Sequence, residues 1–194
     1  KFAQFYAGHS KKFKFDPEYV DFLIAGKTAE ALLRARKNKE ALAAYVALAA
    51  TKNATDLQQA NALRGAASAA RNLKDFAKAD ELVERIPLPA VAMIVHMENL
   101  LAQRKHTELL ELYGKEDFAK WPFPHVSRAA FARAQAHIQI QHGKAAEADL
   151  QTALSLTSDK RLRVSILANL GHNRETNLKD DTRALAAYRL NFEG

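Results

Sequence analysis

Histidine is the residue here best suited to metal binding, so its spacing decides whether a metal site is expected. The 194 residues contain seven histidines. None stands in the H-E-x-x-H spacing that places two imidazoles and a general base on one helix face. His137 and His142 are five residues apart, which puts them on different helix faces, and His96 and Glu98 are only two apart. The sequence therefore predicts no metal site.

The nucleophiles and acidic pairs form no catalytic arrangement either. No serine fits the strand–turn–helix elbow of a hydrolase, and no Gly-rich phosphate loop is present. The chain has no cysteine, which removes thiol chemistry and Cys-based zinc sites. Asp180-Asp181 and Glu116-Asp117 occur where exposed turns are expected, so helix capping explains them better than acid–base work. We expect no enzyme activity, no catalytic residue and no cofactor.

Two features between residues 120 and 146 are unusual. The segment Trp121–His125 begins with the only tryptophan, which is followed by two prolines on either side of Phe123. It is either a rigid recognition loop or, as we favour, a plug between neighbouring hairpins. From Lys120 to Ala146 there is no Asp or Glu, although Arg128 and Arg133 occur there. These cations either meet an acidic peptide or a phosphate, or form a solvated helix face.

The elements that position these residues are predicted to be helices. Hydrophobic residues make up 48% of the chain, many of them alanine, with only 7 Gly and 5 Pro. Asp16-Pro17 predicts a helix start, Thr55 with Gln58 predicts a capping box, and Gly143 is expected to end a helix. Apolar spacing predicts ten helices, over residues 17–36, 39–50, 55–72, 75–85, 89–104, 107–113, 124–142, 145–156, 159–176 and 181–192.

Ten helices with short connections make five antiparallel hairpins, and their second helices share small residues. A hairpin of this size cannot bury its apolar face alone, so stacking on neighbours is expected. The third hairpin has Leu109 where the others place a small residue. The predicted equivalents are Ala41, Ala79, Ala148 and Ala184, followed four residues later by Tyr45, Val83, Thr152 and Tyr188.

Together with Phe76 near Ala79 and Leu170-Gly171 in the ninth helix, this pattern resembles the tetratricopeptide repeat. The spacing of about 36 residues per hairpin is close to the family's period of about 34. The resemblance covers most of residues 17–192. It implies an all-α fold, a right-handed α-α superhelix of about five antiparallel hairpins. We expect this repeat domain over residues 17–194, after an extended lead-in over residues 1–16.

The resemblance also implies where a partner would bind. In this class the first helix of each hairpin lines a concave groove that often holds a peptide, sometimes by its terminal carboxylate. Polar side chains in the otherwise apolar third, seventh and ninth helices are therefore the groove candidates. They are Asn61, Arg64, Ser68, Arg71, Arg133, His137, Gln141, Asn169, His172 and Asn173.

Three functions stay open at this point. The first is a scaffold for protein–protein interaction that binds a protein or peptide, and the net charge of +7 suits an acidic one. The second, nucleic-acid or anion binding, is disfavoured because the basic residues mostly alternate with acidic ones. The third is a helical accessory domain of a larger enzyme, whether exported or not.

The sequence leaves the compartment and the assembly state open. No apolar stretch is long enough to span a bilayer, so a soluble protein is expected, either cytoplasmic or periplasmic and exported. The chain begins with Lys1, as a processed or excised piece of a longer protein would. Its Ala-rich helix faces would also allow two copies to pair as a homodimer.

Overall fold

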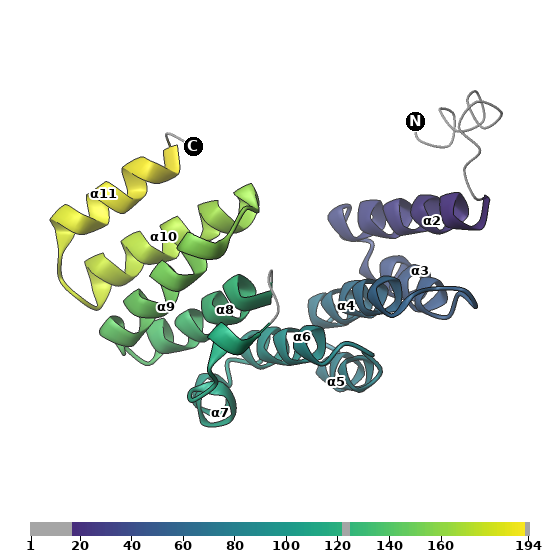
Figure 1. Cartoon of the computed structure of the whole chain (residues 1–194), viewed down its shortest axis with the longest axis horizontal. Helices are drawn as coiled ribbons and strands as arrows, with labels where there is room; N and C mark the ends of the chain where they lie inside the picture. Colours follow the sequence, from purple (N-terminus) through teal and green to yellow (C-terminus); the bar gives the residue numbers. More distant parts are fainter. Residues whose placement is uncertain (1–16, 122–124, 193–194) are drawn as a thin grey trace. The chain divides into compact units, whose positions relative to one another are not determined.

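A computed structural model describes residues 17–121 and 125–192, and all regular structure within these ranges is helical (Figure 1). Ten α-helices and one short 3-10 turn occur there, without a strand, which confirms the all-α prediction. The predicted lead-in over residues 1–16 lies outside the described residues. The chain divides into two compact units, the first ending at Ala92 and the second beginning at Met93. This boundary falls inside helix α6 (Pro89–Ala102).

Unit 1 contains two complete hairpins. Helix α2 (Pro17–Arg34) pairs with α3 (Asn38–Ala49), and α4 (Asp56–Asn72) pairs with α5 (Phe76–Glu84). Helix α4 packs against α3 on one side and α5 on the other, and it also touches α2. Because it has neighbours on several sides, α4 buries seven side chains, six of them alanines, around Leu63. Alanine suits this position because it lets helix backbones approach closely.

Unit 2 continues with α6 from Met93 and adds α7 (His106–Tyr113) and the 3-10 turn η1 (Phe118–Lys120). It then forms α8 (His125–Gln139), α9 (Gly143–Leu156), α10 (Lys160–Thr176) and α11 (Asp181–Phe192). Consecutive helices from α7 to α11 pack on one another. Larger side chains fill this core than in unit 1, among them Met97, Leu100, Leu109, Leu150 and Ile166. The Tyr113 hydroxyl and His96 Nδ1, which share a hydrogen bond of 2.6 Å, join α7 to α6.

The predicted helix starts are supported by side-chain caps. Thr55 Oγ1 accepts a hydrogen bond from the Gln58 N–H, and Gln58 Oε1 accepts one from the Thr55 N–H, so the predicted capping box is confirmed. Asp75 accepts from the Lys78 N–H at the start of α5. Asp159 accepts from the Arg161 and Leu162 N–H groups at the start of α10. These hydrogen bonds hold the pKa of the Asp159 carboxyl below its usual value.

The turn inside each hairpin is closed by a residue in the left-handed region that is not glycine. These residues are Arg36, Lys74, Arg104, Gln141 and Lys179, with φ between 56° and 63°. In the first turn the Lys37 N–H reaches back to the Leu32 carbonyl at 3.0 Å, the hydrogen bond of a Schellman cap. No described glycine has a positive φ, so Gly143 does not end a helix as predicted. Gln141 closes α8, and Gly143 begins α9.

The left-handed residues also set the register of the repeats. Five positions after each one, the second helix presents a buried side chain: Ala41, Ala79, Leu109, Ala146 and Ala184. The predicted equivalence of Ala148 is therefore wrong, because Ala148 and Thr152 are exposed while Ala146 and Leu150 are buried. The same register confirms that Leu109 replaces the small residue in the third hairpin.

The tryptophan packs inside unit 2. Trp121 lies edge-on to Phe118, with ring centroids 4.9 Å apart, and both contact the hydrophobic core. This contact agrees with the plug interpretation for Trp121. Residues 122–124 lie outside the described ranges.

Candidate functional site

Unit 1 carries an open cavity of about 480 Å³ between α2 and α4. Its floor is apolar, formed by Phe22, Leu23 and Leu48 with the ring of Tyr45. Tyr19, 50% exposed, stands at its edge. Gly26 also lines the cavity, and its missing side chain leaves the floor open. The remaining lining residues are Lys27, Glu30, Gln58, Asn61 and Ala62.

The polar rim of this cavity is organised by hydrogen bonds. The Lys27 ammonium lies 3.1 Å from Glu30, which also pairs with Arg34. The hydrogen bond from Lys27 lowers the pKa of the Glu30 carboxyl. An adjoining cavity of about 420 Å³ shares Tyr19, Phe22 and Gln58 and extends to the loop after α3. The rim therefore presents both a cation and a carboxylate above an apolar floor.

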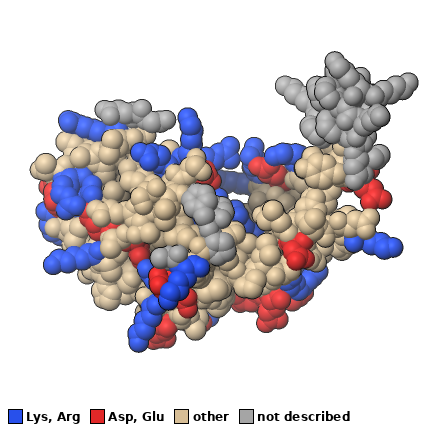
Figure 2. Space-filling view, viewed as in Figure 1, with Lys and Arg blue, Asp and Glu red and all other residues tan. Residues whose placement is uncertain are grey.

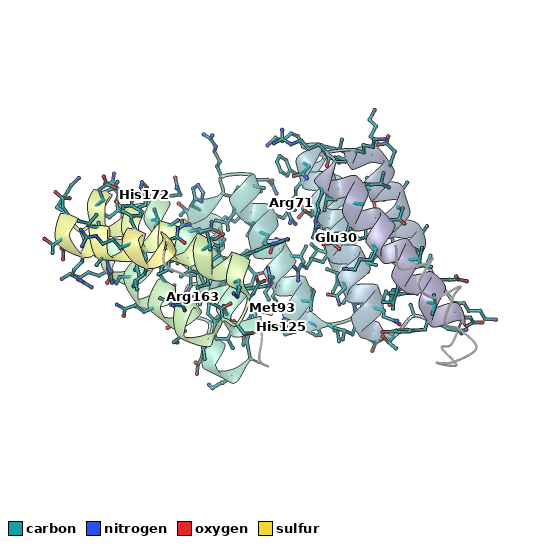
Figure 3. The ribbon with its side chains drawn as sticks, turned by 90° about the horizontal axis from the view of Figure 1, so that it is seen from above. Glu30, Arg71, Met93, His125, Arg163 and His172 are labelled. Atoms are coloured by element: carbon teal, nitrogen blue, oxygen red, sulfur yellow. The ribbon has the colours of Figure 1, made fainter. Side chains whose placement is uncertain are left out.

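The four candidates predicted on α4 differ in exposure, although their spacing of three or four residues places them on one helix face. Asn61 is exposed and lines the cavity. Arg64 is half-buried and close enough to Tyr45 for its charge to act on the phenol, whose pKa is raised mainly by burial. Ser68 and Arg71 are half-buried further along α4, outside the cavity lining. Arg71 is labelled in Figure 3.

Arg133, predicted as a groove residue, is engaged within unit 2. Its Nε and Nη2 donate hydrogen bonds of 2.8 Å to the two carboxylate oxygens of Asp149. Its Nη1 donates to the carbonyl oxygens of Tyr113, Gly114 and Glu116. The guanidinium also lies 4.2 Å from the centre of the Phe118 ring. All three nitrogens are thus used to tie α8 to α9 and to the segment after α7.

His137 lies beside this ion pair. Its Nε2 is 4.0 Å from Asp149, its ring is 5.8 Å from that of His142, and its side chain is only 15% exposed. Burial lowers the pKa of His137, with Arg133 and His142 acting in the same direction and Asp149 opposing them. Gln141, one turn further on, is the exposed left-handed residue of the hairpin turn.

The three candidates on α10 point in different directions. Asn173 is fully buried, and its Nδ2 donates to the Gly143 carbonyl at 2.9 Å, so it holds α10 against α9. His172 is exposed (Figure 3). Asn169 is half-buried and lines a polar cavity of about 440 Å³ with Leu101, Arg104, His106, Gln135 and Gln139. Asn169 is the only candidate that the structure places in this cavity.

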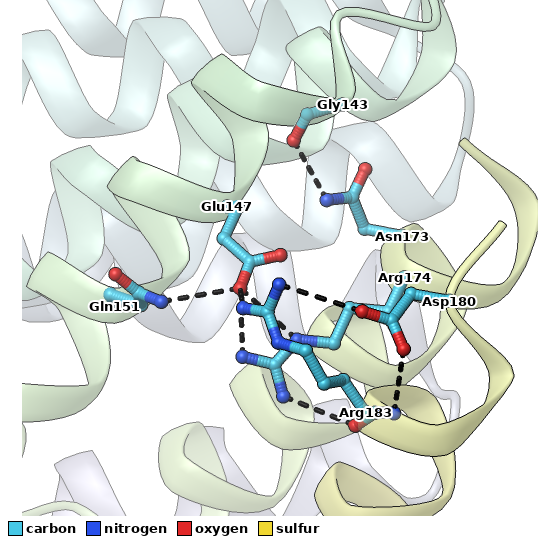
Figure 4. Close-up of polar contacts among 7 residues, drawn as sticks. All are labelled: Gly143, Glu147, Gln151, Asn173, Arg174, Asp180 and Arg183. Carbon is cyan, nitrogen blue, oxygen red and sulfur yellow. Dashed lines mark hydrogen bonds and ion pairs between the residues drawn. The ribbon is translucent and has the colours of Figure 1, made fainter. Parts of the chain in front are cut away.

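A second ion-pair cluster, around Glu147, was not anticipated from sequence. Arg174 of α10 donates to Glu147 Oε1 through Nε (3.1 Å) and Nη2 (2.8 Å), and Arg183 of α11 donates to the same oxygen (Figure 4). Gln151 adds a hydrogen bond of 3.2 Å. Glu147 is 8% exposed, so this cluster joins three helices in a partly dehydrated setting. A lone Glu in an Ala-rich helix gives no sequence signal of such partners.

Within the described residues no three His, Asp or Glu side chains gather closely enough to hold a metal ion. None of the described helices is both long and apolar enough to serve as a membrane span. No protein-family model, curated protein or solved structure matches the chain. The described residues form two kinds of cavity, an amphipathic one in unit 1 and a polar one in unit 2.

Proposed function

We propose that the chain is a protein-interaction module that binds a peptide segment in the α2–α4 cavity of unit 1. The observation that carries this proposal is the lining, which combines an exposed aromatic ring and an apolar floor with the Lys27–Glu30 pair and two amides at the rim. Such a lining suits a peptide with one large apolar side chain flanked by polar residues.

The repeat register supports the same site. If the hairpins are tetratricopeptide-like, α2 and α4 are the first helices of two successive hairpins, and first helices line the groove in that class. The regular left-handed turns and the buried residue five positions later favour a true structural repeat. The right-handed superhelix itself stays a prediction.

Nucleic-acid binding is the weaker alternative because four arginines of unit 2 are already paired with carboxylates of the chain. Arg128, Arg133, Arg174 and Arg183 all bond to carboxylates of unit 2. On the face shown in Figure 2, acidic side chains are interspersed among the basic ones. Dispersed, neutralised cations release few counterions from a phosphate backbone.

The test is a selection of random peptides on the purified chain, followed by fluorescence-polarisation titration of the selected sequences. We expect them to share a large apolar residue. Tyr19→Ala and Asn61→Ala should each weaken binding by about fivefold or more, because each removes one exposed contact. The matched control is Leu57→Ala, since Leu57 is also exposed (57%) on α4 but does not line the cavity. Peptides that bind both cavity variants as tightly as the unmodified chain would show that the cavity is not the site.

A further inference from the structure

The polar cavity of unit 2 is lined by hydrogen-bonding groups that the protein itself does not use. Its volume of about 440 Å³ is within the range of small-ligand sites. Arg104, His106, Gln135 and Gln139 have no side-chain hydrogen bond or ion pair among the described residues. Asn169 uses its Nδ2 to donate to the Ser165 carbonyl, at 2.9 Å, and keeps its Oδ1 free. The guanidinium groups of Arg133 and Arg174, in contrast, donate hydrogen bonds to carboxylates of the chain.

The donors in this cavity meet no negative charge. None of its six lining residues is acidic, whereas the rim of the unit 1 cavity carries Glu30. His106 Nδ1 is buried without a hydrogen-bond partner in the described chain. This nitrogen is covered by the protein itself, so a ligand in the cavity cannot reach it. An acceptor with negative charge would satisfy the Arg104 guanidinium best.

The number of positive charges that line this cavity favours a carboxylate over a phosphate as the ligand. Burial is the main cause that lowers the pKa of His106, and the positive charge of Arg104 adds to it. His106 is therefore largely neutral near pH 7, and Arg104 is the one full positive charge among the lining residues. A single guanidinium matches a singly charged carboxylate and forms two parallel hydrogen bonds with it.

We propose that this cavity of unit 2 binds a carboxylate group, held by Arg104, with His106 and the amides of Gln135, Gln139 and Asn169 pairing with polar atoms beside it. The carboxylate belongs either to a free amino-acid-like molecule or to an acidic side chain of a peptide. This site is separate from the peptide cavity of unit 1 and does not depend on it.

The experiment is a titration of the ¹⁵N-labelled full chain, followed by NMR, with three probes: N-acetylglutamine, which carries one carboxylate, the peptide acetyl-Ala-Glu-Ala-amide, which also carries one, and inorganic phosphate. We expect saturable shifts of the Arg104, His106 and Asn169 signals with at least one carboxylate probe. Stronger binding of N-acetylglutamine identifies a small acid, and stronger binding of the peptide identifies an acidic segment. Absence of saturable shifts there, or tighter binding of phosphate than of either carboxylate, would overturn the proposal.

The decisive variant is Arg104→Gln, because it removes the charge while keeping a residue that the turn accepts. Gln141 occupies the equivalent left-handed position of the next hairpin, with φ of 62°. We expect this variant to weaken carboxylate binding by about tenfold or more. Arg36→Gln is the matched control, since it makes the same change at the same turn position in unit 1 and should leave binding unaltered. Equal weakening by both variants would contradict a local site.

A second readout does not depend on the stability of that variant. A bound carboxylate next to His106 should raise the pKa of the imidazole, followed by NMR titration with and without saturating probe. Gln135→Ala and Gln139→Ala, which leave the turn untouched, should each reduce affinity by a few-fold. An imidazole pKa that does not change at saturation would place the carboxylate elsewhere.

Discussion

The guanidinium of Arg133 and the carboxylate of Asp149 form a pair of parallel hydrogen bonds, each 2.8 Å long, between α8 and α9. The side chains are only 16% and 11% exposed. Since Arg133 also donates to three carbonyl groups, losing it would leave a carboxylate and several carbonyl oxygens without their donors. The pair is thus a structural clamp of unit 2.

Arg133→Ala should therefore destabilise unit 2 by about 3 kcal/mol, because it leaves a mostly buried carboxylate unpaired. Urea unfolding followed by circular dichroism measures this change. The control is Arg128→Ala, whose partner Asp159 is 46% exposed, and a loss below about 1 kcal/mol is expected there. Equal losses in the two variants would mean that burial does not strengthen the Arg133–Asp149 interaction.

Glycine at position 65 is required by an aromatic ring. A Cβ on Gly65 would lie 2.5 Å from the ring of Tyr45, whereas a Cβ on Gly26 would meet Leu48 at an ordinary 3.6 Å. Gly65→Ala should destabilise the protein by about 1–3 kcal/mol through overpacking. Gly26→Ala should stabilise it by about 1 kcal/mol through helix propensity. Thermal unfolding distinguishes them, and a stabilising Gly65→Ala would show that the ring moves aside freely.

Replacing a left-handed turn residue with glycine should raise the free energy of unfolding. Lys74 adopts φ of 63°, a region that costs a residue with a Cβ about 1 kcal/mol. Lys74→Gly is therefore expected to raise the free energy of unfolding by roughly that amount. Ala148→Gly, at an exposed position in the middle of α9, should lower it by about 1 kcal/mol. Equal destabilisation by both substitutions would show that the left-handed conformation of Lys74 costs the chain no stability.

The burial of His137 predicts a loss of stability in mild acid. Its pKa is lowered in the folded chain, so the unfolded chain binds the proton first as the pH falls. The stabilisation from neutral His137 is complete above the unfolded pKa of about 6.5 and declines as the pH drops toward the folded value. His106, also lowered, contributes in the same direction.

Urea midpoints measured between about pH 8 and pH 5.5 should decline for the unmodified chain and decline less steeply for His137→Gln. His172→Gln, at an exposed position, is the control and should keep the original slope. A His137→Gln variant with an unchanged slope would assign the acid sensitivity to other groups.

The helices were predictable because their signals are local. Asp16-Pro17 and the Thr55–Gln58 capping box are signals that lie within two to four consecutive residues. The observed helices begin where these signals predict, at Pro17 and Asp56. Gly143 was misread because a Schellman turn accepts Gln141 when its hydrogen bonds are good. Ala148 was misread because Ala146 and Ala148 are equivalent in composition, and only packing against α8 and α10 decides which is buried.

The binding surfaces were less predictable because they depend on distant partners. Arg133 and Asn61 are both polar residues on the first helix of a hairpin. Arg133 is hydrogen-bonded to Asp149, whereas Asn61 lines an open cavity. Sequence spacing within one helix cannot show which side chain across the hairpin reaches it. Arg104 was missed for the same reason, since it stands in a turn and faces the cavity only because α8 and α10 supply the other walls.

The constant step of five residues from each left-handed residue to the buried one has a consequence for tolerated length changes. The intervals between successive left-handed residues vary from 30 to 38 residues. Between the end of α10 and its left-handed residue there is also one more residue than after the other first helices. The step of five residues is nevertheless the same in all five described hairpins. One residue added within it would rotate the following helix by about 100° and turn a polar face inward. Insertions and deletions are therefore absorbed between hairpins or just before the turn, and each turn resets the frame for the helix after it.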